Sequence, residues 1–93
     1  MSDNHLYCKM MSDLVGEDIL QKCRRAPLVW GRNMVAYKMT LDGVGAEDIA
    51  KTIGLNRTSV IYARKQVKKM LEMPRIYASE MRLWKEFNCL LSS

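Results

Sequence analysis

Apolar side chains recur along this sequence at the three- and four-residue spacing of amphipathic helices, and no segment alternates apolar and polar residues as a strand does. The pattern predicts an all-α protein with about five helices. Residues 1–11 lack a clear period, so we expect a flexible N-terminal arm there, followed by a single helical domain over residues 12–93. Ser12 and Asp13 can cap a first helix that runs to about Cys23.

Prolines and glycines mark the limits of the next helices. Pro27 suits the first turn of a second helix, which should run to about Leu41. Its predicted inner residues are Leu28, Met34, Val35 and Met39. A short third helix is expected over residues 46–53, and Gly54 ends it.

A polar cap and a proline define the last two helices. Asn56 is a favourable N-cap for a fourth helix that extends to about Met73. Pro74 interrupts this helix and can begin a fifth, which should run to about Leu91. Several methionines fall at helical spacing, which favours a role as core filler over a peptide groove. They are Met34, Met39, Met70, Met73 and Met81.

The segment from Ala46 to Lys65 has the spacing of a helix-turn-helix, in which two short helices cross at a tight turn. Its apolar places are filled by Ile49, Ile53, Leu55, Val60 and Ala63. Ala50 supplies the small residue needed where the helices cross, and Gly54 can adopt the positive φ of the turn. An ordinary helical hairpin would supply the apolar places but seldom both of these residues. We therefore predict a helix-turn-helix over about residues 46–73.

If Val60, Ala63 and Val67 face inward, the other side of the fourth helix presents groups suited to duplex DNA. The first turn of a recognition helix reaches base edges in the major groove, where an arginine can bond guanine through two donors. The predicted base-reading residues are Arg57, Thr58, Ser59, Ile61 and Tyr62. The predicted contacts to the DNA backbone are Arg24, Arg25, Arg32, Lys51, Asn56, Lys65 and Lys68, with Lys69 further along the same helix.

Charge is concentrated around this segment. The 93 residues carry a net charge of +5, but residues 22–69 hold eleven Lys and Arg against three acids, Asp42, Glu47 and Asp48. The two ends of the chain are mildly acidic. A basic block of this kind is typical of a surface that binds a polyanion, although a solvated face without a partner would have the same composition.

The stretch from Arg24 to Lys69 resembles the C-terminal duplex-DNA-binding domain of the bacterial replication initiator DnaA, a member of the Trp-repressor-like helix-turn-helix class. Arg24 and Arg25 resemble the basic joint of that family, which reaches the minor groove. Residues 31–37, GRNMVAY, resemble its Arg-led helix, and residues 49–54 the first half of its signature. Residues 56–65, NRTSVIYARK, resemble its recognition helix. Together with the closing LLSS, the likeness extends over about residues 14–93.

The chain departs from the family pattern in two respects. Its turn is one residue shorter, and Arg57 stands before Thr58 and Ser59 where the family has an Asp-His pair. There is also no GxxxxGK[ST] phosphate loop in the sequence, so we do not expect this polypeptide to run an ATP-dependent initiator cycle by itself. The resemblance implies a free-standing DNA-binding regulator of replication or transcription in a bacterial cytoplasm, and a phage or mobile-element regulator would be one such protein.

The sequence gives little support to other functional classes. Cys8, Cys23 and Cys89 form no CxxC pair, and His5 with Cys8 cannot complete a tetrahedral metal site. Because His5 is the only histidine, no catalytic residues, metal or cofactor are predicted, and we expect no enzymatic activity. No apolar run approaches the roughly 18 residues of a membrane span, and the N-terminus lacks the features of a signal peptide.

The competing interpretation is a protein-interaction module. The fifth helix is rich in large apolar residues, namely Leu83, Trp84, Phe87, Leu90 and Leu91. These residues, with Trp30, suit a core, which we favour, but the helix could instead dock a partner protein or a second copy of the chain. In that case the helix-turn-helix would serve only as a scaffold.

Overall fold

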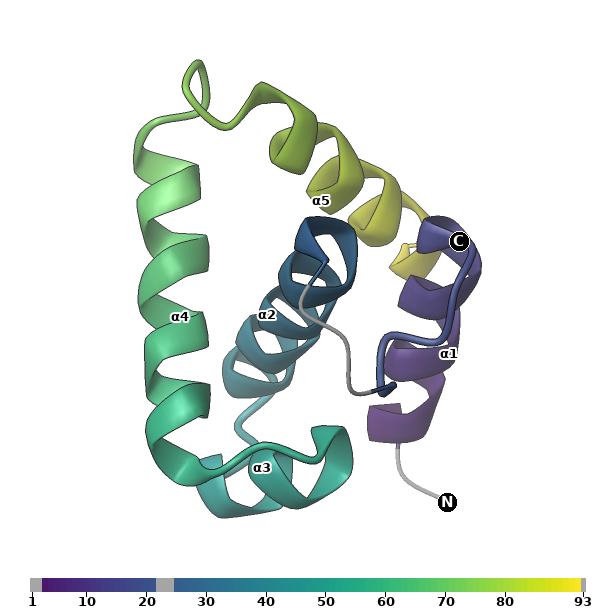
Figure 1. Ribbon diagram of the computed structural model, residues 1–93, viewed down its shortest axis with the longest axis vertical. Coiled ribbons are helices and arrows are strands. Elements are labelled where there is room, and N and C mark those ends of the chain that lie inside the picture. The colour runs from purple at the N-terminus through teal and green to yellow at the C-terminus, as the bar shows by residue number, and fades with distance from the viewer. Residues whose placement is uncertain (1–2, 22–24, 93) are drawn as a thin grey trace.

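A computed structural model describes residues 3–21 and 25–92 of the chain (Figure 1). Its five helices are α1 (Asp3–Val15), α2 (Ala26–Leu41), α3 (Ala46–Ile53), α4 (Arg57–Glu72) and α5 (Ala78–Leu91). These described residues contain no strand, which confirms the all-α prediction and the number of helices. None of the described helices combines the length and the apolar character needed to cross a membrane.

Helix α2 lies at the centre of the molecule, with α4 and α1 on opposite sides of it in Figure 1. Its packing is most extensive against α4, followed by α1. The apolar side chains Leu28, Met34, Val35 and Met39 are all fully buried, as their spacing predicted. Because α4 packs mainly on α2, the orientation of α4 depends on this central helix.

The N-terminal residues form a helix instead of the loose arm and the later helix that we expected. Helix α1 begins at Asp3 and ends at Val15, and it buries Cys8 and Met11 in the core. Gly16, with φ of 88°, ends the helix because few residues other than glycine adopt that conformation. Ser12 therefore lies in the last turn of α1, where its hydroxyl oxygen accepts a hydrogen bond from the Ile19 amide at 3.1 Å.

Gly31 allows α1 and the segment after it to approach α2 closely. A Cβ at this position would lie 3.0 Å from a methyl carbon of Ile19 and 3.1 Å from Cγ of Met11. Both of these side chains are fully buried. Because Gly31 has no side chain, Ile19 and Met11 can pack directly against the backbone of α2.

Helix α5 closes the core through edge-to-face contacts between aromatic rings. The ring of Trp84 meets that of Tyr37 on α2, with centroids 5.7 Å apart, and Phe87 meets Tyr7 on α1 at 6.1 Å. Phe87 is fully buried, whereas Leu90 is 42% exposed. The helix begins at Ala78, later than expected, because the residues after Pro74 form a turn in which the Tyr77 amide donates to the carbonyl of Met73.

The burial of Met11 gives a direct test of whether the N-terminal residues belong to the fold. We expect Met11→Ala to lower the free energy of unfolding by about 2–5 kcal/mol, because it empties a fully buried site. Urea denaturation followed by far-ultraviolet circular dichroism measures this change. Lys9→Ala, on the exposed side of the same helix, is the control and should change stability by less than about 0.5 kcal/mol. Equal stability of the two variants would show that α1 does not support the core.

Candidate nucleic-acid interface

The connection between α3 and α4 is a tight turn centred on Gly54. This residue has φ of 70° and ψ of 28°, the left-handed conformation predicted for it. The following amide, of Leu55, donates to the carbonyl of Ala50 at 2.9 Å and closes the end of α3. Ala50 is itself only 8% exposed, so its small side chain lies in the core.

Asn56 begins α4 as an N-cap, as predicted. Its side-chain oxygen accepts a hydrogen bond from the Ser59 amide at 2.7 Å, which satisfies one of the amides at the start of the helix. The sequence also predicts Asn56 as a contact to the DNA backbone. The structure gives its oxygen a role within the protein, and this role sets where α4 starts.

The inner face of α4 packs on α2 and α3. It consists of Val60, Ala63, Val67 and Met70, all essentially without exposure. At the edge of this face the guanidinium of Arg64 donates to the Thr40 hydroxyl at 2.7 Å, and that hydroxyl donates to the carbonyl of Ala36 at 2.9 Å. This bond joins α4 to α2 and limits rotation of α4 about its own axis.

The exposed residues of α4 occupy one continuous face opposite the buried one. At 3.6 residues per turn they fall within an arc of about 140°. They are Arg57, Thr58, Ile61, Tyr62, Lys65, Lys68, Lys69 and Glu72. We call these eight residues the outer face of α4. The face holds four cations and a single acid, so its charge is strongly positive.

Most of the predicted base-reading residues lie together on this outer face. Arg57 and Thr58 are exposed in its first turn, and Ile61 and Tyr62 are 40% and 61% exposed in the next. Ser59 differs, because it is half-buried and its amide is used by the N-cap. It lies at the margin of the face and not within it.

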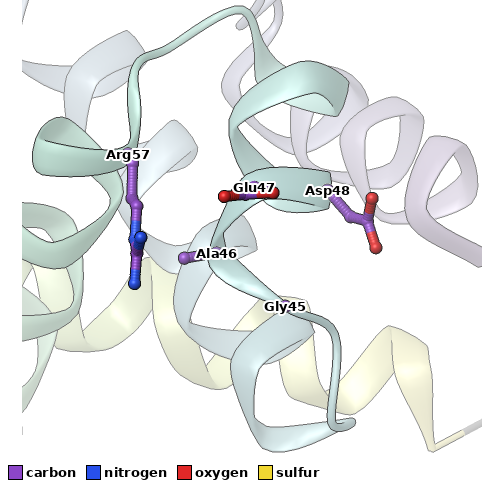
Figure 2. Close-up of a pocket in the computed structure, with 5 residues that line it drawn as sticks. All are labelled: Gly45, Ala46, Glu47, Asp48 and Arg57. Carbon is purple, nitrogen blue, oxygen red and sulfur yellow. The ribbon is translucent and has the colours of Figure 1, made fainter.

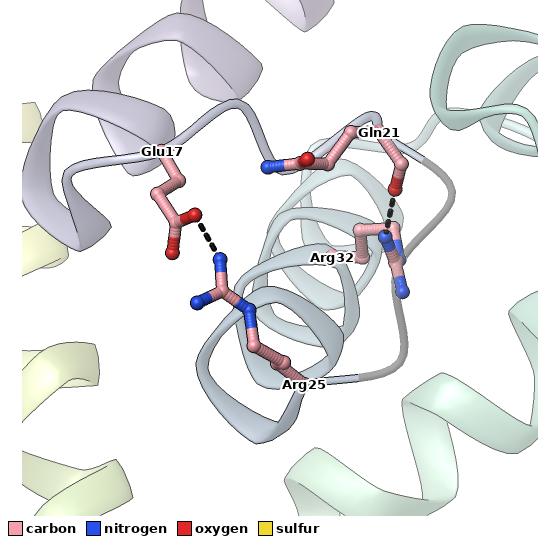
Figure 3. A network of polar contacts seen from close by, with 4 residues as sticks. All are labelled: Glu17, Gln21, Arg25 and Arg32. Atoms are coloured by element: carbon pink, nitrogen blue, oxygen red, sulfur yellow. Dashed lines mark hydrogen bonds and ion pairs between the residues drawn. The ribbon is translucent and has the colours of Figure 1, made fainter.

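The predicted backbone contacts divide into two groups. Lys65 and Lys68 are exposed on the outer face of α4, and Lys51 is exposed on α3. Arg24 lies outside the described residues. Arg25 and Arg32, in contrast, are already bound within the protein (Figure 3).

Arg32 holds the segment that leads into α2. Its guanidinium donates to the carbonyl oxygens of Ile19 at 2.8 Å and Gln21 at 2.9 Å. Figure 3 shows the bond to Gln21. Arg25, at the start of α2, forms an ion pair with Glu17 from the same segment. Arg32, Arg25 and Arg64 thus connect elements of the fold, a role that sequence reasoning missed. For Arg64 the helical spacing gave a signal, since it places this residue beside the buried Val60 and Val67.

Cys8 is a packing residue. Burial raises the pKa of its thiol to about 11, and the negative charge of Asp18 acts in the same direction. Such a thiol stays protonated at neutral pH, unlike the thiolate of a reactive cysteine. Across residues 3–21 and 25–92 there is no group of three or more His, Cys, Asp or Glu side chains placed to hold a metal ion.

The Arg32 contacts predict a loss of stability when its side chain is removed. We expect Arg32→Ala to cost about 1–3 kcal/mol of unfolding free energy, because two carbonyls lose a charged donor. Urea denaturation measures the change. Arg82→Ala, an exposed arginine on α5, serves as the matched control and should have a much smaller effect. If the Arg32→Ala variant is as stable as its control, the hydrogen bonds from Arg32 to the two carbonyls do not stabilise the fold.

The left-handed conformation of Gly54 predicts that a side chain at this position lowers the stability of the protein. We expect Gly54→Ala to destabilise the protein by about 1–2 kcal/mol, since alanine is strained at a φ of 70°. Gly54→Asn should cost less, because asparagine tolerates the left-handed region better. A Cβ at this position has no atom within 4 Å, so a difference between the two variants reports backbone strain and not a clash. Thermal unfolding of both variants provides the comparison.

Comparisons with known proteins identify no family for this chain. No protein-family model, no curated protein and no solved structure matches the chain. The resemblance to the DNA-binding domain of DnaA therefore stays a prediction. The geometry of α3 and α4 and the composition of the outer face are the features of this chain that bear on its function.

Proposed function

We propose that this protein binds double-stranded DNA, with α3 and α4 acting as a helix-turn-helix and the outer face of α4 entering the major groove. The observation that carries the proposal is the division of α4 into two opposite faces. One face is buried and apolar, and the other combines four cations with hydrogen-bonding and apolar side chains. Duplex DNA fits this combination, because it is a polyanion whose base edges accept hydrogen bonds and apolar contacts.

The dimensions of the outer face suit the groove. From Arg57 to Lys69 it extends about 18 Å along the helix axis at 1.5 Å per residue. The major groove is about 12 Å wide and admits one α-helix. A helix lying in it can place its first turns against base edges while its later turns pass the phosphates.

The order of residues along α4 supports a division of roles. Arg57 can bond guanine through two donors, Thr58 can reach a base or a phosphate, and Ile61 can contact a thymine methyl group. Tyr62 lies beside them with a hydroxyl that can donate or accept. The lysines Lys65, Lys68 and Lys69 follow, and they supply charge for phosphates without sequence preference.

Ile61 is an informative member of the outer face. Its side chain is 40% exposed between charged and polar neighbours, although its β-branched apolar surface gains nothing from water. Contact with a thymine methyl would remove that surface from solvent.

Salt dependence is the first test of the proposal. We expect the full chain to bind a random-sequence duplex, with the logarithm of its affinity falling with the logarithm of salt concentration at a slope of about −4, as for four to five phosphates. Fluorescence anisotropy with a labelled duplex measures the slope. If the protein fails to bind any duplex at low salt, the proposal is wrong and the protein-interaction alternative through α5 gains support.

Substitutions on α4 separate base reading from phosphate contact. Arg57→Ala should cost about 1–3 kcal/mol on a duplex selected from a random pool and reduce its preference over random duplex, whereas Lys68→Ala should weaken both duplexes equally. Lys85→Ala, an exposed lysine on α5, is the control for loss of one positive charge. If Lys85→Ala weakens binding as much as Lys68→Ala, the outer face of α4 is not the binding surface.

A further inference from the structure

Ile61 is the only wholly aliphatic residue on the outer face of α4, and the fold holds it in a fixed place. Its neighbours Val60 and Ala63 are buried in the core. In the same turn Arg64 donates to the Thr40 hydroxyl, which joins this part of α4 to α2. A β-branched side chain on a helix also has one strongly preferred rotamer. The exposed part of Ile61 is therefore a rigid apolar surface beside charged and polar groups.

Arg57, in contrast, has room to move. Figure 2 shows its side chain extending from the first turn of α4 alongside Ala46 in the first turn of α3. It borders a hollow of about 290 Å³ that is also lined by Gly45, Ala46, Glu47 and Asp48. Within the described part of the chain no ion pair holds its guanidinium. The guanidinium can therefore turn from the hollow towards the outer side of α4.

Helical spacing places Arg57 and Ile61 next to each other. Ile61 follows Arg57 by four residues, so their Cβ atoms lie about 5–6 Å apart and Ile61 is only about 40° further round the helix. Successive base pairs of a duplex are separated by about 3.4 Å. A base that contacts Ile61 and a guanine that Arg57 bonds are therefore close together, within about two base-pair steps.

We propose that Ile61 recognises the 5-methyl group of a pyrimidine within about two base pairs of the guanine that Arg57 bonds, so that this protein distinguishes 5-methylcytosine from cytosine as well as thymine from uracil. The inference rests on the proposed function and names the kind of duplex that the outer face of α4 selects. Thymine presents its methyl group, at C5, in the major groove. A methyl group at C5 of cytosine has the equivalent place, so Ile61 meets the same apolar group on either base.

The selectivity comes from the removal of apolar surface from water. The exposed part of Ile61 and a methyl group in an open groove are both hydrated before binding. Their contact removes both surfaces from water, and at the usual strength of the hydrophobic effect one methyl group changes affinity by about three- to fivefold. Uracil and unmodified cytosine lack this group. The lysines of the outer face do not discriminate, because phosphates are the same in every duplex.

The experiment changes single methyl groups on the DNA and compares protein variants of the full chain. The starting probe is the tightest duplex recovered with the wild-type protein from a random pool. Each thymine is replaced in turn by uracil. At the position that responds, a cytosine–guanine pair is then tested with and without the 5-methyl group. The variants are Ile61→Ala and Ile61→Val, and the matched control is Ile76→Ala, an isoleucine that is 72% exposed outside α4. Fluorescence anisotropy measures each affinity.

We expect one thymine at which uracil lowers wild-type affinity by about three- to fivefold. At the same position 5-methylcytosine should bind more tightly than cytosine by a similar factor. Ile61→Ala should remove both differences and Ile61→Val should reduce them, whereas Ile76→Ala should retain both. The salt slope should be equal for methylated and unmethylated probes, because a methyl group carries no charge.

A second set of probes locates the guanine. Replacement of guanine by 7-deazaguanine removes the N7 acceptor, so at one guanine it should weaken binding of the wild type but not of Arg57→Ala. We expect this guanine within about two base pairs of the responding methyl group. Because each comparison is between two probes with one protein, a general loss of affinity or stability in a variant does not alter the ratio.

Four outcomes overturn the inference, and only the last also overturns the proposed function. The first is a wild type that binds the selected duplex but responds neither to uracil nor to 5-methylcytosine. The second is a methyl effect that persists in Ile61→Ala, or one that lies far from the guanine contacted by Arg57. A response to uracil without one to 5-methylcytosine is the third, since it refutes recognition of the methyl group itself. The fourth is a wild type that binds no duplex.

Discussion

The packing of α4 on α2 is the interaction on which the rest of the molecule depends. Val60, Val67 and Met70 are fully buried against the central helix, and this burial decides which side of α4 points outward. Rotation of α4 by a third of a turn would expose these residues and bury lysines, at a cost of several kcal/mol. The bond from Arg64 to Thr40 lies at the edge of this contact and limits rotation of α4 about its own axis.

The basic block of the sequence has two physical roles in the folded chain. Arg25, Arg32 and Arg64 are bound to a carboxylate, to carbonyls and to a hydroxyl, and they hold helices or the segments between them. The exposed cations of α4 are one arginine at its start and three lysines further along. Guanidinium groups suit the first role because their several donors lie in fixed directions, whereas an exposed lysine retains most of its hydration and mobility. Net charge alone therefore overstates the surface available to an anion.

Sequence reasoning succeeded where a local signal decides the structure. Gly54 and Asn56 each act through their own backbone or the next turn, so their residue types were sufficient to place the limits of α3 and α4. It failed for α1, which packs against α2, α3 and α5 and so presents no single apolar stripe. For the candidate site, sequence spacing placed Arg57, Thr58, Ile61 and Tyr62 on one face. It could not reveal that Arg32 is held by carbonyl oxygens, because that contact depends on the path of residues 16–21.

The choice of cap at the start of α4 is consistent with an outer face that meets a polyanion. An aspartate at position 56 would cap the helix as well as asparagine does and would also interact favourably with the helix dipole. It would, however, place a negative charge next to Arg57, at the end of the helix proposed to read bases. Asparagine satisfies the Ser59 amide without that charge, so the stability of α4 comes from a neutral cap and from burial. The acids of this region are instead Glu47 and Asp48, which lie in the first turn of α3.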